Sequence, residues 1–203
     1  MFVELLEHLR CIGAHEPGPL VVAATRLEHR HILDGVLGCP VCGAEYPLRD
    51  GIARFGAPPA VRPQPPSVEA AMRVAAFLGL TDSGGFVVLS GSWCAHVTEL
   101  ARLVETPLVL VNPPEGAAME GAAAVLTVAG ALPFAPGSAR ALALDPDAVP
   151  MEPSIALVRA GGRVLAPVST PLMPSLREVA RDAADWVAER VGAPALVELK
   201  RAR

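Results

Sequence analysis

Cys39 and Cys42 form a Cys-Pro-Val-Cys pair that is followed directly by Gly43. Two thiolates at this spacing can hold one zinc ion, and the glycine lets backbone amides turn towards the sulfur atoms. A tetrahedral site needs two further ligands, for which Cys11 and His15 are the first candidates. Three other histidines compete for the fourth position: His8, His29 and His31. The pattern therefore predicts a zinc site of Cys11, His15, Cys39 and Cys42.

The alternative interpretation is a cysteine knuckle that carries no metal. A segment as small as residues 1–55 has little core of its own and gains much of its stability from a bound ion, which favours zinc. Its expected small core is a group of four apolar residues. They are Tyr46, Leu48, Ile52 and Phe55.

A second candidate site lies at a predicted strand-to-helix turn in the sequence VVLSGSWCAHVTELA, residues 87–101. Turns of this kind that bind nucleotides are rich in glycine, because the backbone must approach the ligand closely. This turn has a single glycine, Gly91, followed two residues later by Trp93. An indole at a close-approach position would fill the space that a ligand needs.

The chain divides at a proline-rich stretch, GAPPAVRPQPPS, which predicts an extended linker over residues 56–67. We expect a separate metal-binding unit at 1–55 and an α/β domain at 68–203. Helices are predicted at 67–80, 95–105 and 175–192, with another ending at 155–160. Strands are predicted at 86–91, 107–112, 123–130, 139–146, 163–168 and 195–202. Their alternation predicts a mainly parallel sheet covered on both faces.

Composition narrows the class of protein. Hydrophobic residues make up 52% of the 203 residues, so a core can form, and the net charge of −4 argues against a general nucleic-acid-binding surface. No apolar run approaches the roughly 18 residues of a membrane helix, and the N-terminus lacks the basic start of a signal peptide. We expect a cytoplasmic protein with reduced cysteines.

The first 55 residues resemble a known family. An LLxxLxC opening and a CPxCGxxYPxRDGI ending are similar to the small zinc-binding, zinc-ribbon-like activators that partner methyltransferases acting on tRNA, rRNA and release factors. Ala14 stands where the second cysteine of that family's opening pair is found. The resemblance implies an activator that docks on a methyltransferase and covers apolar surface.

The second part resembles class I S-adenosylmethionine-dependent methyltransferases. The similar segments are AGALPFAPGSARALALDP, residues 129–146, and VRAGGRVLAPV, residues 158–168. The resemblance implies a trimmed Rossmann-like domain whose cofactor positions are Gly91, Trp93, Asn112 and Gly130. Trp93 stands at the second glycine of the family's turn, Asn112 at the ribose-binding acid, and Gly130 near the adenine-binding acid.

Three altered contacts favour a protein that no longer transfers methyl groups. The first hypothesis is a non-catalytic, methyltransferase-like partner or regulatory subunit with a zinc-binding domain. The alternative is an active methyltransferase acting on RNA, protein or a small molecule, since such enzymes mainly position their substrates. A third is a structural subunit that binds through a face around Trp93 and Trp186. Asp145 and Asp147 are interpreted as a capped turn.

Overall fold

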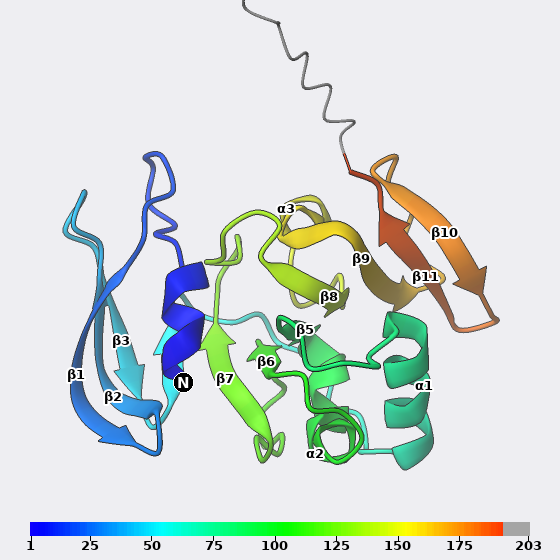
Figure 1. Cartoon of the computed structure of the whole chain (residues 1–203), viewed down its shortest axis with the longest axis horizontal. Coiled ribbons are helices and arrows are strands. Elements are labelled where there is room, and N and C mark those ends of the chain that lie inside the picture. The colour runs from blue at the N-terminus through cyan, green and yellow to red at the C-terminus, as the bar shows by residue number, and fades with distance from the viewer. Residues whose placement is uncertain (193–203) are drawn as a thin grey trace, which may run out of the picture.

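The computed structural model describes residues 1–192, so the strand predicted at 195–202 lies outside the described residues. Eleven strands form one mixed sheet in the order β1-β2-β3-β4-β7-β6-β5-β8-β9-β11-β10 (Figure 1). The strands are β1 (Val21–Glu28), β2 (His31–Gly38), β3 (Glu45–Arg49), β4 (Ile52–Arg54), β5 (Val87–Ser90), β6 (Leu108–Val111), β7 (Ala122–Thr127), β8 (Ala139–Ala143), β9 (Val158–Pro167), β10 (Leu176–Arg181) and β11 (Asp185–Arg190). The fold is therefore a mixed α/β structure.

The centre of the sheet is parallel, from β7 through β6, β5 and β8 to β9. Every residue of β5, β6 and β8 is buried. Such continuous apolar strands are expected where a sheet is covered on both faces. In chain order these five strands are the third, second, first, fourth and fifth, so the direction of winding reverses between β5 and β8.

Two helices, α1 (Val68–Leu78) and α2 (Val97–Ala101), cover one face of this central part (Figure 1). The side chain of Ser67 accepts a hydrogen bond from the N–H of Ala70 at 3.2 Å and so caps the start of α1. The helix predicted from residue 67 is confirmed. It ends at Gly79, which adopts a left-handed conformation.

The opposite face is covered by the N-terminal segment, which forms the 3₁₀ helix η1 (Val3–His8) rather than an α-helix. Leu5 and Leu9 are buried in the same core as Phe134 and Val109. Backbone hydrogen bonds tie the segment to the central domain, among them one from the N–H of Arg10 to the carbonyl of Pro133 at 2.9 Å.

The N-terminal strands continue the central sheet. β1 to β4 are antiparallel to one another, but β4 pairs in parallel with β7, and Ile52 lies opposite Val125. Tyr46, Leu48 and Phe55 are buried in the core that also contains Leu126. Ile52 instead packs against the core on the helical face. The segments on either side of the linker thus share both a sheet and a core.

The helix predicted at 175–192 is wrong, because this stretch forms the antiparallel hairpin of β10 and β11. The Oδ1 atom of Asp182 accepts hydrogen bonds from the N–H groups of Ala184 and Asp185, both at 2.8 Å, and this closes the turn. β11 lies between β9 and β10, and Trp186 is completely buried, donating its indole N–H to the carbonyl of Thr170. Trp186 therefore does not contribute to the partner-binding face predicted around Trp93 and Trp186.

Two other predicted helices are shorter than expected. Residues 91–96 form the 3₁₀ helix η2 (Gly91–His96), and α2 covers only part of the range 95–105. The helix predicted to end at 155–160 is α3 (Met151–Ala156), and β9 begins at Val158. A Cβ atom on Gly162 would lie 2.4 Å from the carbonyl oxygen of Arg140. This glycine therefore serves close strand packing, and not the end of a helix.

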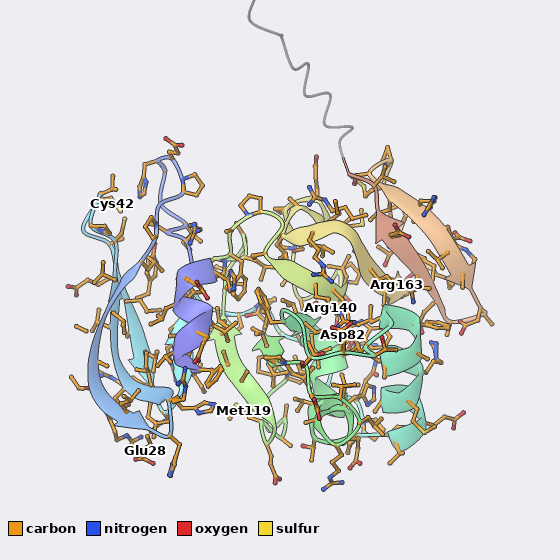
Figure 2. The ribbon with its side chains drawn as sticks, in the orientation of Figure 1. Glu28, Cys42, Asp82, Met119, Arg140 and Arg163 are labelled. Carbon is orange, nitrogen blue, oxygen red and sulfur yellow. The ribbon has the colours of Figure 1, made fainter. Side chains whose placement is uncertain are left out.

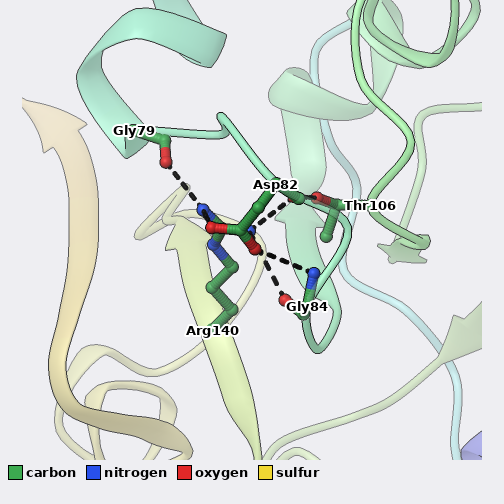
Figure 3. A network of polar contacts seen from close by, with 5 residues as sticks. All are labelled: Gly79, Asp82, Gly84, Thr106 and Arg140. Carbon is green, nitrogen blue, oxygen red and sulfur yellow. Dashed lines mark hydrogen bonds and ion pairs between the residues drawn. The ribbon is translucent and has the colours of Figure 1, made fainter.

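A polar network fixes the loop between α1 and β5 at the amino end of β8 (Figures 2 and 3). Arg140, which is 7% exposed, donates to the Oδ2 atom of Asp82 at 3.1 Å and to the carbonyl of Gly79 at 2.8 Å. The hydroxyl of Thr106 donates to the carbonyl of Asp82 at 2.6 Å. The network joins α1, β8 and the segment before β6.

None of the helices within residues 1–192 is long and apolar enough to cross a membrane.

Candidate functional site

The four predicted metal ligands converge at one end of the N-terminal strands. The ligand atoms of Cys11, His15, Cys39 and Cys42 all lie within 4.8 Å of one another. Cys11 and His15 come from the loop after η1, and the other two from the turn between β2 and β3, where Figure 2 labels Cys42. This cluster can hold a metal ion.

The distances between these atoms suit tetrahedral coordination. The sulfur atoms of Cys11 and Cys42 are 3.7 Å apart, and the sulfur of Cys39 lies 3.4 Å from Nε2 of His15. With metal–sulfur bonds of about 2.3 Å, two ligands of a tetrahedral zinc ion are separated by roughly 3.8 Å. The three-cysteine, one-histidine set and its spacing are therefore compatible with zinc.

The orientation of His15 also suits a ligand. Its Nδ1 atom lies 2.7 Å from the carbonyl oxygen of Glu16. A carbonyl can only accept, so Nδ1 carries the proton and the lone pair of Nε2 is directed at the cluster. The competing histidines are not part of the cluster. His8 packs against Phe86, His31 against Phe2, and His29 lies in the turn between β1 and β2.

Backbone amides surround the cysteine sulfurs. The N–H of Cys42 and then that of Val41 lower the pKa of Cys39. Burial opposes ionisation of Cys11, but hydrogen bonds from the Tyr46 hydroxyl, at 3.3 Å, and the Gly13 N–H, also at 3.3 Å, lower its pKa.

The thiol of Cys42 differs from those of Cys11 and Cys39 in the direction of its pKa shift. The N–H of Ala44 favours its thiolate, but burial and the neighbouring Cys39 and Cys11 outweigh this and raise the pKa of Cys42. Three thiolates at this distance repel one another, and a bound cation would relieve that repulsion.

Three of the four residues predicted at the carboxyl edge of the sheet lie beside the turn after β8: Gly91, Trp93 and Asn112. Gly91 has a φ of 57°, and a Cβ atom there would lie 2.4 Å from Oδ2 of Asp145. The same Oδ2 atom accepts hydrogen bonds from the N–H and the hydroxyl of Ser92, at 2.8 and 2.7 Å. The backbone N–H of Ser92, which follows Gly91, is thus already hydrogen-bonded to the side chain of Asp145.

Asp145 was interpreted from the sequence as part of a capped turn, and its Oδ1 atom does accept from the N–H of Asp147 at 3.0 Å. Its contact with the turn after β5 was not predicted. The only signal in the sequence was an acidic residue directly after an apolar strand.

Trp93 is partly buried, and its indole N–H donates to the carbonyl of Leu144 at 3.1 Å. The ring packs against the core on the helical face of the sheet. Cys94 beside it is completely buried, and this burial raises the pKa of its thiol to about 12. Both residues therefore hold the turn against the sheet.

Asn112 is completely buried and has a φ of 50°. Its side-chain amide donates to the carbonyls of Val128, at 3.0 Å, and Ala148, at 2.9 Å. Its Oδ1 atom accepts from the N–H of Val128 at 2.8 Å. Gly130 is partly exposed, and a Cβ atom there would meet no atom within 4 Å.

A polar cavity of about 570 Å³ lies at this edge, beneath the linker. Its charged lining side chains are Arg62, Asp145 and Asp147, and Gln64, Ser92 and Ser169 also reach it. Trp93, Asn112 and Gly130 are not among its lining residues.

Comparison of the sequence with models of known protein families, and with characterised proteins, found no match.

Proposed function

We propose that this chain is a non-catalytic, methyltransferase-like protein whose N-terminal segment is stabilised by a zinc ion. The metal part of the proposal rests on the donor set of Cys11, His15, Cys39 and Cys42 and on its near-tetrahedral spacing. All four positions are occupied by protein ligands, which is typical of structural rather than catalytic zinc.

The order of the parallel strands supports the methyltransferase-like part. Counted along the chain, they follow the order 3-2-1-4-5, as do the first five strands of Rossmann-type nucleotide-binding folds. Such folds bind ligands outside the carboxyl ends of the strands, at the point where the order reverses. Here that point lies between β5 and β8, next to Gly91 and Asp145.

The non-catalytic part of the proposal rests on one observation: the polar groups at this point are hydrogen-bonded to one another. Both N–H donors and the oxygen of the Asn112 side chain are hydrogen-bonded to backbone groups, and the carboxylate of Asp145 accepts from the N–H of Ser92. A cofactor that bound to Asn112 and to the N–H of Ser92 would have to break these hydrogen bonds, and leaving buried groups unpaired costs roughly 1–3 kcal/mol each.

An active methyltransferase is the alternative function. The cavity of about 570 Å³ favours it, because this volume is within the usual range for a small-molecule site. On this alternative, the ligand would lie against Arg62 and Asp147 rather than against Asn112.

Calorimetric titration of the metal-loaded protein with S-adenosylmethionine and with S-adenosylhomocysteine tests the proposal. We expect no saturable heat with either compound at millimolar concentration. Binding of either compound with micromolar affinity would overturn the non-catalytic assignment and favour the alternative.

A further inference from the structure

A groove with a volume of about 410 Å³ lies beside α2, between the linker and the loop that follows β6. Its walls are Pro63 and Pro66 on one side and the segment from Pro114 to Glu120 on the other. Ala95, Thr98 and Glu99 of η2 and α2 form the third wall. None of the four predicted cofactor positions lines it.

The groove exists because one connection of the sheet has no helix. Parallel neighbours such as β6 and β7 are normally joined by a crossover of a dozen or more residues that contains a helix. Residues 112–121 make this connection without a helix, so the helical layer that contains α2 has no helix from this connection. A segment of another protein could complete this layer.

The chemistry of the walls limits what would fit. The apolar part is formed by prolines and alanines, and every charged residue of the lining is acidic: Glu99, Glu115 and Glu120. Glu99 is paired with Arg102 at 3.0 Å. Within residues 1–192, Glu115 and Glu120 form no ion pair, and both are exposed.

The linker adds further acceptors. Proline has no N–H, and within the described chain residues 57–66 take part in no backbone hydrogen bond, so their carbonyl groups are free to accept. A groove that has carboxylate and carbonyl oxygens between apolar walls suits a side chain with several N–H donors at the end of an apolar chain. Arginine has this chemistry, with five N–H donors and a side chain that packs along apolar surface.

We propose that this groove binds an arginine-bearing segment of a partner protein. Gln64 lines both this groove and the polar cavity at the carboxyl edge, so the two hollows adjoin. Together they are longer than a single bound side chain requires. That continuity favours a peptide segment over a small cation. The proposal does not depend on whether the protein binds an adenosyl cofactor.

The test uses the full-length protein and a short capped peptide, Ala-Pro-Arg-Ala-Pro, with binding measured by calorimetry or by amide shifts in NMR. A second peptide replaces arginine with citrulline, which keeps the shape and removes the charge. We expect the arginine peptide to bind and the citrulline peptide to bind at least about tenfold more weakly.

Two double variants separate the groove from the charge of the whole protein. E115Q/E120Q removes the two unpaired groove carboxylates, and we expect it to weaken binding about tenfold. E28Q/E45Q removes two exposed carboxylates on the N-terminal strands and should leave affinity unchanged. Circular dichroism of both variants verifies that they fold alike.

Three results would overturn the proposal. The first is the absence of binding at millimolar peptide, and the second is equal affinity for the citrulline peptide. The third is self-association in sedimentation experiments that E115Q/E120Q abolishes, because it would assign the groove to a second copy of this chain.

Discussion

Asn112 joins three parts of the sheet with a single side chain. Asn112 directly follows β6, and its side-chain amide is hydrogen-bonded to the residue after β7 and to the turn after β8. An amide can do this because it has both donors and an acceptor, whereas a carboxylate has acceptors only. Asn112, which the resemblance to class I methyltransferases aligns with a ribose-binding acid, is therefore suited to a structural role.

Replacing Asn112 with Asp tests this role. The carboxylate would face two carbonyl oxygens that have lost their donors, so we expect the free energy of unfolding to fall by about 3 kcal/mol. Urea denaturation measures the change. A loss below about 0.5 kcal/mol, or the gain of cofactor binding, would contradict the structural role.

The metal site also makes a prediction at the scale of single residues. Cys39→Ser should abolish metal binding, because it removes one of the four ligands. Cys94→Ala removes the buried thiol outside the cluster and should retain about one zinc ion per chain. Mass spectrometry of protein purified without chelator measures the content. Less than half an ion in the unsubstituted protein would argue against the site.

The sequence predicted residues more reliably where the chemistry is local. The Cys-x-x-Cys pair and its glycine indicated a metal site directly, and the structure brings His15 and Cys11 to it. The contacts of Asp145 and Asn112 join segments that are far apart in the chain. No local pattern contained that information.

At the scale of elements, the spacing of apolar residues along the sequence explains which helices and strands were predicted correctly and which were not. The buried strands β5 and β6 were recognisable as almost continuous apolar runs, and β8 as an apolar run that contains one arginine. The stretch 175–192 carries apolar residues at spacings that suit a helix, yet it forms a hairpin. Burial of Trp186, Val187 and Ala188 between two neighbouring strands outweighed the local preference.

The loop after α1 offers an element-scale prediction of pH dependence. The N–H of Gly84 and the guanidinium of Arg140 lower the pKa of Asp82. Because its pKa is lower in the folded state, Asp82 stabilises the fold above its unfolded value of about 3.9, and this contribution is lost as the pH falls through the folded pKa.

The matched variant is Asp82→Asn, which cannot ionise. We expect its free energy of unfolding to fall less than that of the unsubstituted protein between about pH 5 and pH 2. Chemical denaturation across this pH range provides the measurement. Parallel curves for the two proteins would show that the Asp82 carboxylate does not contribute.

For the whole molecule, the sheet and the core run across the predicted domain boundary. β4 pairs with β7, and Tyr46 shares a core with Leu126. The division at residues 56–67 remains a prediction from proline content. Composition could indicate a linker, but it could not indicate that the strands on either side of the linker would pair.

Metal removal tests whether residues 1–55 and the rest of the chain unfold together. A bound ion at about a thousandfold excess over its Kd stabilises the folded state by about 4 kcal/mol. Because of the shared core, we expect a chelator to lower the melting temperature of the entire chain in one transition. If hydrogen exchange showed that residues 1–55 melt separately from the rest of the chain, the two parts would instead be independent domains.

The central claim is that the protein's own hydrogen bonds close the carboxyl edge of the sheet to an adenosyl cofactor. The most direct measurement is an NMR titration with S-adenosylhomocysteine that follows the backbone amide of Ser92 and the side-chain amide of Asn112. We predict that neither signal moves at millimolar ligand. A saturable shift of both signals would show that the edge opens to the cofactor and would contradict the account.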